Sequence, residues 1–122
     1  MQYVSWKDDK TPQSIPPKEW TLLVFNGKSL ISPTASALGH FAIYVNVKDT
    51  GGSGRLKMRF SRDPLKTNDF TGQHFMDLTV DRFESHTWFF QARKGVPLGV
   101  MVYHDGPRPL ILATREFKAA IG

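Results

Sequence analysis

Residues 39–47, Gly-His-Phe-Ala-Ile-Tyr-Val-Asn-Val, carry the pattern that decides the fold. From Phe41 to Val47 every second residue is a large apolar one. Successive side chains of a β-strand point to opposite faces, so this period of two indicates a strand with one buried face. Residues 55–60 repeat the pattern, with basic residues on the outward face. The glycines within 48–54 predict a hairpin that joins these two strands.

Further strands are predicted on both sides of this pair, at 2–6 as an edge strand and at 20–25, 29–32, 75–80, 86–92, 98–104 and 110–117. Asn26-Gly27 predicts a type I′ turn. Turns spaced by about 8 to 12 residues are typical of a β-sandwich. We therefore predict one all-β domain over residues 1–122, a two-sheet sandwich of jelly-roll type. Its predicted core comprises Phe41, Ile43, Val45, Leu56, Met58, Phe60, Trp88, Phe90, Val100 and Val102.

The composition is that of an ordinary globular chain and excludes several classes of site. Hydrophobic residues make up 40% of the 122 residues, enough for a packed core. The absence of cysteine excludes disulfides, thiolate nucleophiles and cysteine-ligated metals. No apolar run approaches the roughly 20 residues that span a bilayer, and residues 1–10 lack the pattern of a secretory signal, so no membrane partner is expected. The net charge of +5 permits an acidic partner.

The polar segment 7–18 contains three prolines and is predicted to be an extended surface arm. It either lies across a neighbouring subunit or packs on its own domain as an ordinary loop. Residues 88–90 place bulky rings on both faces of one strand, which suggests that a partner covers one of them. The predicted partner-docking residues are Pro12, Pro16, Pro17, Trp88 and Phe89.

The polar residues give no catalytic or metal-binding motif. The four histidines, at positions 40, 74, 86 and 104, lack the short spacings of metal ligands, and no Gly-x-Ser-x-Gly sequence is present. The glycine-rich stretch 51–54 joins two predicted strands, unlike a phosphate-binding loop, which leads into a helix. We therefore expect no enzymatic activity, no metal and no cofactor.

Two surface features bear on binding. Arg55, Lys57 and Arg59 form a basic row, but the neighbouring ring of Phe60 is predicted to point inward, so we expect no nucleic-acid partner. The row is instead predicted to pair across the sheet with Asp77 and Asp81. A sugar-stacking platform is the alternative function for the aromatic side chains, although a core or a subunit interface would explain them equally well. The aromatic residues considered for the platform are Trp6, Trp20, Tyr44, Trp88 and Tyr103.

Four runs of sequence carry a resemblance to a known group of proteins: RLKMRFSRDP at 55–64, DFTG at 69–72, GVMVYHDGPRPL at 99–110 and TREFK at 114–118. Together they resemble the small minor tail or virion-associated proteins of long-tailed phages that infect actinobacteria. The resemblance implies a non-enzymatic, multimeric virion subunit, made in the host cytoplasm and bound to other virion proteins, most simply at the tail tip. A capsid decoration protein and a module that binds a glycan of the host surface are the alternative functions.

Overall fold

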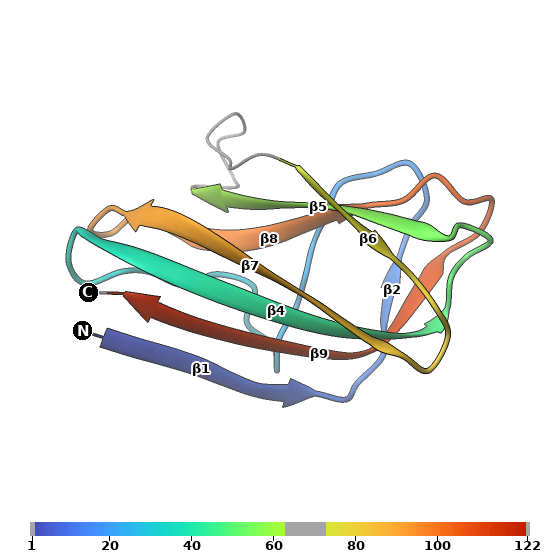
Figure 1. The fold of residues 1–122 in the computed structure, drawn as a ribbon, viewed down its shortest axis with the longest axis horizontal. Coiled ribbons are helices and arrows are strands. Elements are labelled where there is room, and N and C mark those ends of the chain that lie inside the picture. The colour runs from blue at the N-terminus through green and yellow to red at the C-terminus, as the bar shows by residue number, and fades with distance from the viewer. Residues whose placement is uncertain (1, 63–72, 122) are drawn as a thin grey trace.

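The computed structural model describes residues 2–62 and 73–121, in which all the regular secondary structure is β-strand (Figure 1). The sequence also predicts a long polar loop at 61–72, and all of it except residues 61 and 62 lies outside the described residues. In the described part of the chain no helix is long and apolar enough to cross a membrane. The strands are β1 (Gln2–Asp9), β2 (Gln13–Ile15), β3 (Thr21–Leu22), β4 (Ala37–Asp49), β5 (Arg55–Arg62), β6 (His74–Asp77), β7 (Phe83–Ala92), β8 (Leu98–Tyr103) and β9 (Leu110–Ile121).

The strands form two antiparallel sheets. One has the order β1-β9-β4-β7, with the short β2 also paired to β9, and the other has the order β3-β8-β5-β6. Setting β2 aside, this order is that of a jelly roll, in which the chain crosses repeatedly from one sheet to the other. The predicted all-β, two-sheet sandwich of jelly-roll type is confirmed, and β1 is an edge strand as expected.

The core lies between the sheets and is built around aromatic rings. Phe41 of β4 stacks on Trp88 of β7, with 4.8 Å between ring centroids, and on Phe60 of the opposite sheet at 4.4 Å. Phe117 of β9 stacks on the same Phe41 ring at 4.5 Å. Every residue predicted for the core is at most 7% exposed, so the predicted strand faces are correct.

The predicted hairpin between 39–47 and 55–60 is wrong. β4 pairs with β7 and β9, whereas β5 pairs with β6 and β8 in the other sheet. Each strand has one apolar face, and the two faces are buried against each other across the sandwich. The connecting loop packs on the β8–β9 turn, where Arg108 Nη1 donates to Asp49 Oδ2 at 2.9 Å. A Cβ added to Gly106 would lie 2.4 Å from the Gly51 carbonyl oxygen, so the two turns are in tight contact.

The Asn26-Gly27 turn is confirmed, but its flanking strands are shorter than predicted. Both residues have positive φ, 53° and 82°, as a type I′ turn requires. Phe25 and Lys28 exchange both backbone hydrogen bonds, at 2.7 and 3.0 Å. The predicted strand 20–25 is reduced to β3, and 29–32 pairs only through the bridge of Ile31 to Leu98.

Segment 7–18 packs on its own domain, which is the second of the two alternatives that the sequence leaves open, but it does so partly as strands and not as an ordinary loop. Residues 13–15 form β2 on β9, Ile15 is fully buried, and Asp9 ends β1 opposite Arg115. The physical reason is that proline pushes the preceding residue into extended geometry, which is also the geometry of a strand. Residues 13–15 retain their backbone N–H groups and therefore complete the pairing that proline cannot.

Candidate functional site

The outer face of the β3-β8-β5-β6 sheet carries the basic row predicted from the sequence. Leu56, Met58 and Phe60 of β5 are fully buried beneath it. Arg55 is exposed and Lys57 and Arg59 are half-buried on the opposite, outward side. The alternation of β5 thus places three cations on the surface of a sheet whose other side is core.

Aromatic side chains from the neighbouring strands lie in register with Lys57. Tyr103 of β8 and Phe75 of β6 are its direct cross-strand partners. Trp20, just before β3, contacts Tyr103 with 5.5 Å between ring centroids. We call Trp20, Tyr103, Lys57 and Phe75 the cross-strand row. It crosses all the strands of this sheet, a width of about 14 Å at about 4.8 Å per strand.

The cations of this face pack against the rings. Lys57 Nζ lies 5.1 Å from the Tyr103 centroid and 5.8 Å from that of Phe75. The Arg59 guanidinium carbon lies 4.1 Å from the Trp20 centroid, and burial lowers the pKa of that guanidinium. These distances are those of cation–π contacts.

Carboxylates share the same face. Arg55 pairs with Asp77 as predicted, at 3.3 Å, whereas Asp81 lies in the turn before β7 and its backbone bonds Val47. A depression of about 80 Å³ opens beside the cross-strand row. It is lined by Arg55, Lys57, Phe75, Tyr103, His104 and Asp105. Stacking surfaces, a cation and a carboxylate therefore meet within one shallow site.

His104, which borders this depression, has a structural role. Its ring is buried, with Nε2 2.9 Å from the carbonyl oxygen of Ile15. Its Nδ1 accepts from the Gly106 amide at 3.3 Å, so Nε2 is the nitrogen that carries the proton. The ring thereby connects β2 to the β8–β9 turn.

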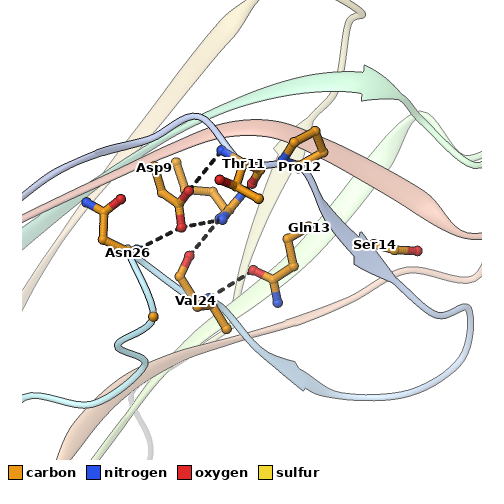
Figure 2. A pocket seen from close by; sticks show the side chains of 9 residues that line it. Asp9, Thr11, Pro12, Gln13, Ser14, Val24 and Asn26 are labelled. Atoms are coloured by element: carbon orange, nitrogen blue, oxygen red, sulfur yellow. Dashed lines mark hydrogen bonds and ion pairs between the residues drawn. The ribbon is translucent and has the colours of Figure 1, made fainter.

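A larger pocket, of about 470 Å³, lies at the N-terminal side of β9 and is shown in Figure 2. Arg115 there donates to Asp9 at 2.8 Å and to the carbonyl oxygens of Val24, Thr11 and Leu112. These contacts use four of the five N–H groups of a guanidinium. Its polar groups therefore hold chain segments together.

The side chains of Asp9 and Gln13 likewise bond to groups of the protein itself. Asp9 accepts from the backbone amides of Thr11 and Asn26, at 2.9 and 2.7 Å. Burial would raise the pKa of Asp9, but these amides and Arg115 outweigh it and hold the pKa below its usual value. The Gln13 side chain bonds Val24 N and Leu22 O, both at 2.9 Å. We assign this pocket a structural function.

Two of the histidines meet where β6 and β7 approach each other across the sandwich. The His74 and His86 rings stack with 3.5 Å between centroids, and Trp88 packs edge-on against His86 at 4.4 Å. Burial, and then the adjacent His74, lower the pKa of His86. Among the described residues no group of three histidine or acidic side chains is placed to hold a metal ion.

The predicted docking residues do not form one surface. Trp88 is 6% exposed in the core, which corrects its assignment to a docking face, and Pro16 and Pro17 are half-buried. Phe89 is 80% exposed on the outer face of the other sheet, and Pro12 is exposed beside the larger pocket.

The predicted sugar-stacking residues also separate. Trp20 and Tyr103 come together, whereas Trp88 is in the core and Tyr44 lies on β4 in the other sheet. The side chain of Trp6 is outside the part of the molecule that the structure describes. Sequence reasoning missed Phe75 beside Lys57. Phe60 does point inward as predicted, but rings from other strands flank the basic row. The rings belong to strands paired with β5, and only the pairing shows this.

The similarity of this chain to known proteins is distant. No protein-family model and no curated protein matches the chain. Solved structures that it resembles include the CBM22-1 xylan-binding domain of Xyn10C from Paenibacillus barcinonensis, with 13% sequence identity and a TM-score of 0.39. That match covers 95% of this chain and 85% of the other. A likeness this distant assigns no family to the chain.

Proposed function

We propose that this protein is a glycan-binding module whose site is the outer face of the β3-β8-β5-β6 sheet. The observation that supports this is the cross-strand row, in which three rings and a lysine follow one line across the sheet. The apolar faces of sugar rings pack on aromatic side chains, whose large area and few rotatable bonds suit them to this contact. The cations and Asp105 supply hydrogen bonds to the hydroxyl groups at the edge of a stacked sugar.

We propose binding without catalysis. Glycoside hydrolysis uses two carboxyl groups across a cleft, one of them with a raised pKa. On this face Asp77 is exposed and ion-paired with Arg55, so this carboxyl group lies on an open surface and not within a cleft. The adjacent His104 ring is buried and both of its nitrogens are bonded to backbone groups, so neither is available to a ligand.

The test is binding of the intact protein to a panel of soluble and insoluble polysaccharides, followed by single ring removals. Tyr103→Ala and Phe75→Ala should each weaken binding by about tenfold, a loss of about 1.4 kcal/mol. The matched control is Phe89→Ala, which removes an exposed ring from the opposite sheet and should leave the affinity unchanged. An equal loss in the control, or no binding to any polysaccharide, would contradict the proposal.

A second candidate function is that of a virion subunit, a minor tail component or a capsid decoration protein. One observation favours it beside the resemblance: Leu38 and Phe89, 71% and 80% exposed, lie on adjacent strands of the other sheet next to His40. Exposed apolar side chains that lie together are typical of protein interfaces. Phe89→Asp should then prevent incorporation into particles, as detected by electron microscopy of labelled virions, while Phe75→Ala should not.

A further inference from the structure

Lys57 occupies the centre of the cross-strand row and is positioned from both sides. It lies directly opposite Tyr103 on one neighbouring strand and Phe75 on the other. Its Nζ is within 6 Å of both ring centroids, and its half-buried stem lies between them. A ligand ring stacked on either side chain would therefore bring its substituents to the ammonium group.

The charge of Lys57 is available to such a ligand. Within the described part of the chain no ion pair joins its ammonium group to a carboxylate. Arg55, in contrast, pairs with Asp77, and Arg59 stacks on Trp20 with Nη2 3.7 Å from the Met101 sulfur. Lys57 is thus the cation of this face best placed to recognise a negative charge.

The other charges of the face limit the kind of anion. Among the side chains that the structure describes on this face, three cations stand beside two carboxylates, Asp77 and the Asp105 that lines the depression. A single-stranded nucleic acid carries a phosphate on every nucleotide and binds along a strongly positive groove. This nearly balanced face suits a chain whose negative charges are farther apart and whose remaining groups are hydroxyls.

We infer, on the basis of the proposed function, that the glycan bound by this face is acidic. Its anionic substituent, a uronate carboxylate or a sulfate, contacts Lys57 while the sugar ring stacks on Tyr103 or Phe75. Asp105 accepts hydrogen bonds from neighbouring hydroxyls and repels a second anionic group placed beside the first.

The test compares two ligands that differ in charge: polygalacturonate with most of its carboxyl groups methyl-esterified, so that the free acids are far apart, and the fully methyl-esterified form. The acid should bind the intact protein about tenfold more tightly at low ionic strength, as expected for one charge-assisted hydrogen bond. This advantage should shrink as salt is added. Lightly sulfated dextran and unmodified dextran form a second matched pair, and the pair with the larger difference identifies the anionic substituent.

The decisive variant is Lys57→Gln, which removes the charge and keeps most of the stem. It should abolish the preference for the acid, so that acid and ester bind with equal affinity, whereas Lys57→Arg should retain the preference. Lys94→Gln, an exposed lysine in the β7–β8 turn, is the matched control and should change neither affinity. The thermal midpoint of each variant verifies that it is folded.

Several results would overturn the inference. Equal affinities for acid and ester, or a preference that survives Lys57→Gln, would remove Lys57 from recognition and leave the glycan-binding proposal standing. Binding to neither member of either pair, nor to any neutral polysaccharide, would overturn both. Tighter binding of a single-stranded thymidine oligonucleotide than of every glycan, lost in Lys57→Gln, would reassign the face to nucleic acid.

Discussion

The outer face of the β3-β8-β5-β6 sheet and the pocket beside β9 contain the same kinds of charged side chain, but these are exposed on the sheet and buried in the pocket. Each has an Arg–Asp ion pair, Arg115 with Asp9 in the pocket and Arg55 with Asp77 on the sheet. The side chains of the first pair are 2% and 6% exposed, and those of the second 61% and 83%. The larger cavity is the structural one, because its polar groups are bound to the protein itself. Polar groups that are available to a ligand identify a binding site better than the volume of a cavity does.

The sharpest way to break this comparison is to remove one acid from each pair. Asp9→Ala leaves a buried guanidinium and two backbone amides without their acceptor, and we expect a loss of about 3–5 kcal/mol in the free energy of unfolding. Asp77→Ala, the matched control, should cost less than about 1 kcal/mol. Chemical denaturation measures both, and similar losses would show that burial does not separate the two pairs.

The next effect concerns the segment that supplies Asp9. The Ile15 side chain of this segment is fully buried in the core, so Ile15→Ala should lower the free energy of unfolding by about 2–5 kcal/mol. The exposed Pro12, in the same segment, should tolerate alanine with a change of under about 1 kcal/mol. Thermal and denaturant unfolding test this; an Ile15→Ala protein as stable as the wild type would favour the other alternative, a segment that lies across a neighbouring subunit.

A smaller effect is expected from pH. Because the pKa of His86 is lowered from 6.5 in the folded state, the unfolded chain binds more protons in mildly acidic solution. Stability should therefore fall as the pH drops below about 6.5, until the folded-state pKa is passed. His86→Gln should reduce this fall, and the exposed His40→Gln should not. Facing charges include His74 and, two positions earlier on β7, Glu84. The unfolding midpoints of these proteins, measured from pH 7.5 to 5, test this expectation.

The smallest change in stability is expected where the proposed change in binding is large. Phe75 is 50% exposed, so Phe75→Ala should alter the free energy of unfolding by less than about 1 kcal/mol while it weakens glycan binding. Unfolding and binding measured on one preparation separate the two effects. A large loss of stability would instead place Phe75 with the structural residues.

The sequence predicts which face of each strand is buried better than it predicts which strands pair with each other. The alternation in β4 and β5 identifies which side of each strand is buried, and this local property was correct for every predicted core residue. The alternation does not say which strands pair. The predicted hairpin therefore joins β4 to β5, although these strands belong to different sheets. The candidate site depends on that missing information, because Lys57 meets Phe75 and Tyr103 only through pairing between residues distant in the chain.

The contact between Gly51 and Gly106 determines where the chain can accept extra residues. A Cβ on Gly51 would lie 2.5 Å from the Arg108 carbonyl oxygen, and both glycines are buried, so neither turn can lengthen unless the other moves with it. Gly95, in the turn near the opposite end of β4, has open space around its Cβ position. A scan of short peptide insertions should therefore find the β7–β8 turn permissive and the two glycine turns intolerant. The end of the sandwich near the cross-strand row is thus the one whose loop lengths are fixed.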